Sequence, residues 1–194
     1  MTMRNAEASK ERILEAAMAE FSAHGIAGAR VDRIAKAAGC NKNLIYIYFD
    51  NKETLFATLL QKHLLRVYED ISFTPDDLPG YAARVFDFGM SRPDLMRLLA
   101  WYNLEQQNAV PPERSAAHGA KVGELAVAQR AGRVGGAFPP HFLMTAVMTL
   151  ATAWTAANPF GASLDADSTK DLAALREAVS AAVGLLARKD DAAR

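Results

Sequence analysis

The chain has 194 residues, of which 51% are hydrophobic and 23% are charged, and its formal net charge is zero. This composition is typical of a folded globular protein, and a single cysteine excludes a disulfide framework. Residues 1–66 hold ten Lys or Arg and seven Asp or Glu, a net charge of +3, so the remaining residues carry −3. A basic first part on an acidic body is the polarity expected of a protein that presents its first part to phosphates.

The distribution of apolar residues does not indicate a membrane protein. The longest apolar stretch, residues 142–157, is interleaved with threonines and is shorter than the ~20 residues that a membrane-spanning helix needs. The first residues lack the apolar segment of a secretory signal peptide. We therefore expect no membrane association and a cytoplasmic location.

Helices are expected nearly throughout the chain. Alanine is abundant, and no segment shows the period-two alternation of a half-buried strand. The first helix is predicted over residues 9–24, with Ser9 as its N-cap and Gly25 as the residue that ends it.

The most informative segment is residues 30–52, RVDRIAKAAGCNKNLIYIYFDNK. Its first part places apolar residues at the spacing of one buried helix face, namely Val31, Ile34, Ala35 and Ala38. Gly39 then supplies the backbone freedom of a tight turn. A second short helix over residues 42–49 buries Ile45 and Phe49 and leaves Lys42, Asn43 and Tyr46 outward. Two short helices joined in this way are typical of a helix-turn-helix that binds the major groove of DNA.

The remaining helices are predicted from capping and loop signals. Asp50 and Glu53 form an Asp-x-x-Glu pattern that predicts the start of a longer fourth helix. Beyond a Pro- and Asp-rich loop at residues 73–80, helices are expected at about residues 79–90, 93–107, 112–131, 140–157 and 168–189, the last capped by Ser168 in Ser-x-x-Asp. We therefore predict an all-α fold of about nine helices, with a DNA-binding domain over residues 1–55 and a helical regulatory and dimerisation domain over residues 56–194.

A spaced pattern of residues runs in register from the end of the first expected helix to the start of the fourth. It comprises Phe21, Gly25, Ile34-Ala35, Ala38-Gly39, Ile45-Tyr46, Tyr48-Phe49 and Lys52-Glu53-x-Leu55. In this pattern the first quarter of the chain resembles the TetR family of bacterial regulators. The rest matches that family only in being all-helical and of suitable length.

The resemblance implies which residues contact a double-stranded DNA operator. Carried over position by position, the DNA-binding candidates are Arg30, Lys42, Asn43, Leu44, Tyr46, Tyr48 and Lys52. Lysine and asparagine side chains suit the guanine and adenine edges of the major groove, and Lys52 lies where helix amides already favour phosphate. Two departures stand out: Ala29-Arg30 replace the Thr or Ser that often caps the second helix, and Tyr48 replaces a common histidine.

The resemblance also implies a small-molecule effector bound in the body. The tentative pocket residues are Phe86, Trp101, Tyr102, Glu105, His118 and Phe142. An apolar wall with one carboxylate suits a ligand site. Aromatic residues at helical spacing are, however, more often core residues, and Glu105 and His118 are equally compatible with the surface.

The sequence indicates no catalytic site, metal site or cofactor. The four histidines lack metal-ligand spacing, and there is no nucleophile-elbow or phosphate-loop motif. We therefore expect no enzyme activity.

The expected last two helices indicate how the protein assembles. Both MTAVMTLATAWTAA and AVSAAVGLLA are apolar or small on nearly every side, and a helix without a polar face is buried. We expect a homodimer through a four-helix bundle of these helices. The expected function is a ligand-responsive repressor of a palindromic operator. Two alternatives remain: a helical small-molecule-binding or catalytic protein that keeps the helix-turn-helix as scaffold, and a DNA-binding protein with an unresponsive body.

Overall fold

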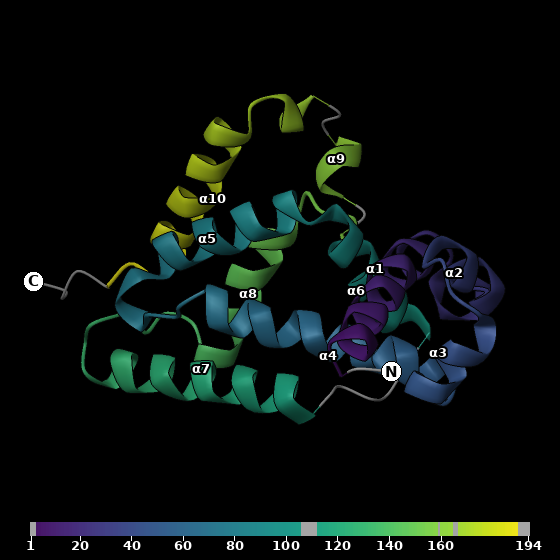
Figure 1. Ribbon diagram of the computed structural model, residues 1–194. Coiled ribbons are helices and arrows are strands. Elements are labelled where there is room, and N and C mark those ends of the chain that lie inside the picture. The colour runs from purple at the N-terminus through teal and green to yellow at the C-terminus, as the bar shows by residue number, and fades with distance from the viewer. Residues whose placement is uncertain (1–2, 106–111, 159, 165–166, 190–194) are drawn as a thin grey trace, which may run out of the picture. The chain divides into compact units, whose positions relative to one another are not determined.

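A computed structural model describes residues 3–105, 112–158, 160–164 and 167–189 (Figure 1). Within these ranges it contains helices and no strand, so the predicted all-α fold is confirmed. Nine of the helices have seven or more residues. The elements are α1 (Met3–Gly28), α2 (Val31–Ala37), α3 (Lys42–Phe49), α4 (Lys52–Asp70), η1 (Pro75–Asp77), α5 (Leu78–Ser91), α6 (Pro93–Glu105), α7 (Pro112–Arg130), α8 (Pro140–Thr152), α9 (Gly161–Leu164), η2 (Ser168–Lys170) and α10 (Leu172–Leu186), where η marks a short 3-10 helix.

The chain forms two compact units. The first comprises residues 1–67 and 94–109, and the second comprises residues 68–93 and 110–194. The first unit therefore gathers α1, α2, α3, most of α4, and α6. This grouping differs from an expected division after residue 55, because that position lies inside α4 and because α6 packs with the N-terminal helices.

The core of the first unit is built from one face of each of its helices. Fully or nearly fully buried side chains are Ile13, Ala17 and Phe21 of α1, Ile34 of α2, Ile45 of α3, Leu55, Phe56 and Leu59 of α4, and Leu95 and Leu98 of α6. Phe56 joins three helices, since its ring lies 5.2 Å from that of Phe21 and stacks at 6.2 Å on that of Tyr102. This packing fixes α1, α4 and α6 around a common aromatic contact.

The turn between α2 and α3 has the conformation that the sequence predicts. Gly39 has φ +62°, a left-handed backbone that favours glycine. The N–H of Cys40 donates to the carbonyl of Ala35, and the N–H of Gly39 donates to that of Lys36. This is the Schellman arrangement that satisfies the last carbonyls of a helix.

Two predicted helix starts in the first unit are wrong. Ser9 is not an N-cap, since α1 already begins at Met3 and the buried Ser9 hydroxyl donates to the carbonyl of Asn5 within the helix. Asp50 does not cap α4 either. The side chain of Asn51 accepts the N–H of Thr54 at 2.7 Å, whereas Asp50 adopts φ +64° just after α3. A Ser or Asp near an expected helix start is therefore not sufficient to identify the N-cap in this unit.

The ends of the last helices also differ from the prediction. Asp171, and not Ser168, caps α10 by accepting the N–H of Ala174 at 2.9 Å, and residues 168–170 form the short helix η2. Helix α8 ends at Thr152, and the expected continuation to residue 157 is a series of turns. The Thr155 side chain there bonds to the carbonyl of Thr152, which gives the backbone an alternative to the helix.

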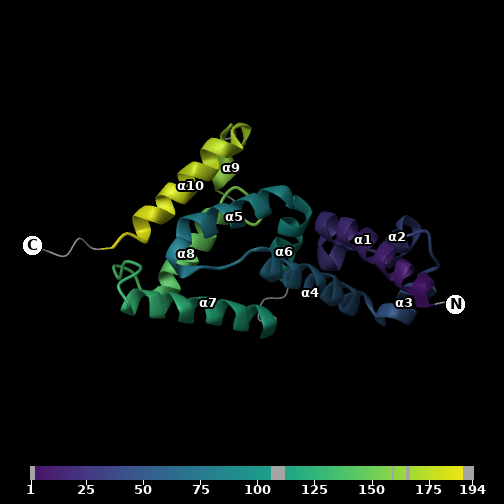
Figure 2. The same cartoon turned by 60° about the vertical axis from the view of Figure 1, so that its left-hand side comes forward.

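In the second unit, α5 packs against both α10 and α8, and α7 packs against α8 (Figures 1 and 2). Its buried side chains come from all four helices, including Tyr81 and Phe86 of α5, Leu125 of α7, Leu143 and Val147 of α8, and Val179 and Val183 of α10. Helices α8 and α10 bury one face each in this core and leave another face exposed.

Candidate nucleic-acid interface

The recognition helix α3 is anchored by two residues and exposes the others. Ile45 and Phe49 are buried, whereas Lys42 and Asn43 are exposed and Tyr46 is 41% exposed. Asn41 is the N-cap of this helix, since its side chain accepts the N–H of Asn43 at 2.9 Å. The predicted bounds of this helix, residues 42–49, are confirmed. Leu44 is half-buried beside this outward face.

Sequence reasoning missed Ile47, which is 74% exposed in the middle of α3. The signal was present, because Ile45 and Phe49 are buried four residues apart and so place residue 47 outside. The methyl group of thymine is an apolar contact in the major groove, and an outward isoleucine on a recognition helix suits it. Ile47 is therefore a further candidate for base contact.

Lys42 is held by a neighbouring carboxylate. Its ammonium lies 3.0 Å from Asp32 of α2 and 6.0 Å from the ring centre of Tyr46. The hydrogen bond to Asp32 raises the pKa of Lys42, so the lysine stays charged. Asp32 is also a negative charge on the face that would meet phosphates.

Replacing Asp32 by asparagine is therefore expected to raise affinity for operator and unrelated duplexes alike by about 2–5-fold at low salt. The change removes a repulsive charge and frees Lys42. Fluorescence anisotropy with both duplexes measures it, and Glu7→Gln, which removes an exposed carboxylate of α1, is the matched control. Equal affinities for Asp32→Asn and the wild type would contradict the prediction.

The start of α2 is capped by a residue of α1. Arg30 occupies the N-cap position without a side-chain cap, as the absence of Thr or Ser predicts. Instead, Glu20 accepts the Arg30 N–H at 2.8 Å and the Arg33 Nε–H at 2.8 Å. Burial alone raises the pKa of Glu20, but these hydrogen bonds outweigh burial and hold it below its usual value. The stabilisation from the hydrogen bonds of ionised Glu20 is thus present at neutral pH, and it is lost as the pH falls through the lowered pKa of Glu20. The Arg30 side chain remains exposed.

Tyr48 and Lys52 lie at the end of the motif and are both engaged. The Lys10 ammonium lies 5.5 Å from the ring centre of Tyr48, which also meets Phe49 edge-on at 6.3 Å. The Lys52 ammonium donates to the carbonyls of Ala29 at 3.2 Å and Ala27 at 3.4 Å. Lys52 is therefore oriented by the backbone between α1 and α2.

Lys52→Met is expected to weaken binding to operator and unrelated duplexes alike by about fivefold, and to reduce the salt slope by about one. The ammonium is lost while the apolar stem is kept. A salt titration by anisotropy measures both values. Lys36→Met removes the same charge from an exposed position of α2 and is the comparison. An unchanged slope would exclude a phosphate contact by Lys52.

The six tentative effector residues are distributed over both compact units. Trp101, Tyr102 and Glu105 belong to the first unit, where they contact α1 and α4. Phe86, His118 and Phe142 belong to the second. Phe86 is a core residue at 1% exposure, His118 is half-buried, and Phe142 is 51% exposed and stacks on Phe138.

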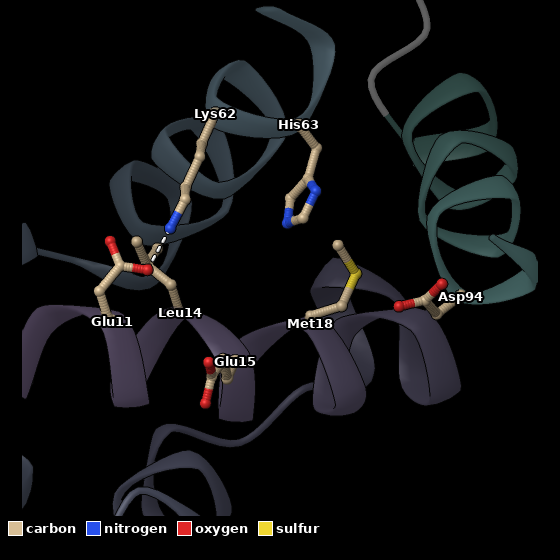
Figure 3. Close-up of a pocket in the computed structure, with 7 residues that line it drawn as sticks. All are labelled: Glu11, Leu14, Glu15, Met18, Lys62, His63 and Asp94. Carbon is tan, nitrogen blue, oxygen red and sulfur yellow. Dashed lines mark hydrogen bonds and ion pairs between the residues drawn. The ribbon is translucent and has the colours of Figure 1, made fainter. Parts of the chain in front are cut away.

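A cavity of about 450 Å³ lies within the first unit, between α1, α4 and the first turn of α6 (Figure 3). It is lined by Glu11, Leu14, Glu15, Met18, Lys62, His63 and Asp94. Lys62 forms an ion pair with Glu11 across the gap between α4 and α1. None of the tentative effector residues lines this cavity. In the ranges that the structure covers, no cluster of His, Cys, Asp or Glu suits a metal ion.

The fold and this interface together define the class of the protein. An anchored recognition helix, a Schellman turn and an exposed set of Lys, Asn, Tyr and Ile side chains constitute a helix-turn-helix DNA-binding module. Across the described residues, none of the helices has the length and apolar character to cross a bilayer.

Comparisons with known proteins identify the family. Residues 13–59 match the family of bacterial regulatory proteins, tetR family, and residues 77–184 match the tetracyclin repressor-like C-terminal domain. The chain is similar to HTH-type transcriptional repressor SCO4008 of Streptomyces coelicolor, with 41% identity over 162 residues, 82% of this chain and 84% of the relative. It is also similar to HTH-type transcriptional repressor NicS of Pseudomonas putida, with 29% identity over 150 residues, 72% of this chain and 70% of the relative.

A solved structure agrees. The crystal structure of the transcriptional regulator SCO4942 from Streptomyces coelicolor is 35% identical and has a TM-score of 0.82, covering 94% of this chain and 99% of that one. The chain therefore belongs to the TetR family of transcriptional regulators.

Proposed function

We propose that this protein is a ligand-responsive transcriptional repressor that binds a palindromic operator as a homodimer. The main observation in support is the arrangement of side chains on α3. Ile45 and Phe49 are buried and anchor the helix, so that Lys42, Asn43 and Tyr46 face solvent. A helix whose backbone is fixed in this way presents side-chain donors and acceptors to base edges. Names of related proteins such as SCO4008 and NicS support repression over activation.

The exposed faces of α8 and α10 support the proposed dimer. On α10, the exposed residues Ala174, Ala178, Ala181 and Leu185 follow one another at intervals of four, three and four, opposite the buried Val179 and Val183. On α8, Phe142 is 51% exposed. An exposed stripe of small and apolar residues on α10, together with an exposed phenylalanine on α8, suits a symmetric four-helix interface.

We assign DNA contact to residues 1–55, with Arg30, Leu44, Tyr48 and Lys52 at the edges of the recognition helix. Residues 56–194 carry effector binding and dimerisation. The effector is a small molecule that binds the two conformers of the dimer differently, since an equal affinity would shift nothing. The protein acts by binding and not by catalysis, and a regulator of chromosomal DNA acts in the cytoplasm.

Selection from a random duplex library, followed by an anisotropy titration across a salt series, tests this function. The expected result is a palindromic sequence that binds two protomers per duplex with steep salt dependence. A protein that enriches no sequence, even after denaturation and refolding to remove any bound ligand, would instead favour the alternative of a helical binding protein with a non-functional helix-turn-helix.

A further inference from the structure

Helix α1 is broken at Gly25. This residue has φ +69° and ψ −177°, outside helical geometry, although helical residues continue to Gly28. In a regular helix the N–H of residue i donates to the carbonyl of residue i−4, so Ile26 would donate to Ser22. The break removes that bond and leaves both groups in need of partners.

Two side chains of α6 supply the missing partners. Glu105 accepts the N–H of Ile26 at 3.1 Å and the N–H of Ala27 at 2.9 Å, one on each carboxylate oxygen. The indole N–H of Trp101 donates to the carbonyl of Ser22 at 3.2 Å. Trp101 and Glu105 lie one turn apart on α6, and we call this pair the α6 clasp. It satisfies both ends of the broken Ser22–Ile26 bond.

The clasp fits only a glycine at the break. A Cβ atom at residue 25 would lie 2.2 Å from Glu105 Oε1 and 2.9 Å from Trp101 Cε3. Contacts of this length do not occur between real side chains, so α6 could not approach α1 as closely. The glycine is therefore required both for its backbone conformation and for the space that it leaves.

The carbonyl groups of the same turn are held from elsewhere in the first unit. Lys52, the first residue of α4, donates to Ala27 and Ala29, and Arg33 of α2 donates to the carbonyl of Gly28 at 3.0 Å. A carboxylate thus binds the N–H side of the turn while cations bind its carbonyl side. This turn leads directly into α2 and hence fixes the start of the helix-turn-helix.

We propose that Trp101 and Glu105 are positioning residues for DNA binding, because they hold α1 open at Gly25 and so set the place from which α2 and α3 begin. The proposal rests on the proposed function and adds the way in which α6 controls it. When the clasp is released, Ile26 can donate to Ser22 again and α1 becomes continuous. Glycine adopts both conformations, so the two hydrogen-bond patterns are discrete alternatives. A ligand that favours the released pattern lowers DNA affinity to the extent that it binds that conformer better.

Hydrogen exchange tests the clasp without DNA. In the full-length protein, Glu105→Ala is expected to speed exchange of the Ile26 and Ala27 amides by about tenfold or more. Both amides lose their acceptor, while the Trp101 indole still occupies the Ser22 carbonyl and so keeps α1 broken in this single variant. The control is Glu15→Gln, an exposed carboxylate of α1 outside the clasp, which should leave these two amides unchanged. Unchanged exchange in Glu105→Ala would overturn the proposal. Because this readout needs no operator, it separates failure of the clasp from failure of the proposed function.

Operator affinity gives a second test, in which the direction of the change in affinity is decisive. Loss of a negative charge near DNA by itself strengthens binding, as expected for Glu15→Gln. The clasp predicts the opposite for Glu105→Ala, an affinity about tenfold lower, with a smaller loss for Glu105→Gln, which keeps one acceptor oxygen. Affinity for the operator equal to or tighter than that of the wild type would overturn the proposal.

Trp101→Phe completes the test with a change that keeps a six-membered aromatic ring and removes the pyrrole part of the indole together with its N–H donor. Since Trp101 and Glu105 hold the two ends of one broken bond, the double variant is expected to lose less affinity than the product of the two single losses. Strict additivity would show that the residues act separately and would overturn their action as a pair. Circular dichroism at the assay temperature verifies folding, and Glu105→Gln with Trp101→Phe gives the same comparison if Glu105→Ala does not fold.

Discussion

Replacing Gly25 by alanine is expected to lower the free energy of unfolding by about 2–4 kcal/mol and to weaken operator binding by about tenfold or more. Alanine at φ +69° is strained, and its Cβ would meet both Glu105 and Trp101 at less than van der Waals distance. The chain can relieve the clash only by moving α6 or by changing the break in α1. Urea unfolding at fixed protomer concentration and operator titration measure the two effects.

Two other glycines separate the causes of this loss. Gly39 has φ +62° but open space around its Cβ position, so Gly39→Ala reports the strain of a positive φ without a clash, about 1 kcal/mol. Gly25, at ψ −177°, lies in a region that is essentially restricted to glycine and is strained more by alanine. Gly28 has ordinary backbone geometry, and its Cβ would lie 3.5 Å from that of His24, so Gly28→Ala should be close to neutral. If Gly25→Ala costs no more than Gly39→Ala, the close approach of α6 contributes nothing.

Placing arginine at both Ala178 and Ala181 is expected to convert the proposed dimer into monomers and to weaken operator binding by about 100-fold or more. Both residues belong to the exposed stripe of α10. Two charges buried against their symmetry mates would lack partners, and a monomer would lose the linkage of two recognition helices. Sedimentation velocity gives the mass, and anisotropy gives the affinity.

The matched control is Ala173→Arg, an exposed position of α10 that lies about 100° around the helix from Ala174 and therefore off the stripe. This variant should stay dimeric and keep operator affinity. A doubly substituted protein that remains a dimer would show that the interface lies elsewhere, as would a dimer that survives deletion of α10.

The longer helices were predictable along this chain, but three of their N-caps were not. Ser9, Asp50 and Ser168 each satisfied a capping pattern, yet in the structure a longer α1 absorbs Ser9, while Asn51 and Asp171 cap α4 and α10. The pattern is short, and several residues near a helix start can supply the same oxygen. Which of these residues caps the helix depends on the position at which the apolar face of that helix begins to pack against the core.

Trp101 and Glu105 illustrate what a local pattern leaves open. Their spacing on α6 predicted a ligand wall, and a role in effector binding stays a prediction. The contacts that the structure gives them are with Ser22, Ile26 and Ala27, up to 79 positions away in the sequence. Nothing in the residues around Gly25 indicates that its broken hydrogen bond would be replaced from α6.

The sequence alone determined the helix-turn-helix, because its signals are local: the apolar spacing of α2, the glycine turn at Gly39 and the buried pair Ile45 and Phe49 lie within 20 residues. Only the tertiary structure decided how that motif is held. Pairing of Lys42 with Asp32, capping of α2 by Glu20 and closure of the α1 break by α6 join residues from different helices. Such contacts depend on how helix faces pack against one another, and periodicity within one helix carries no information about its partner.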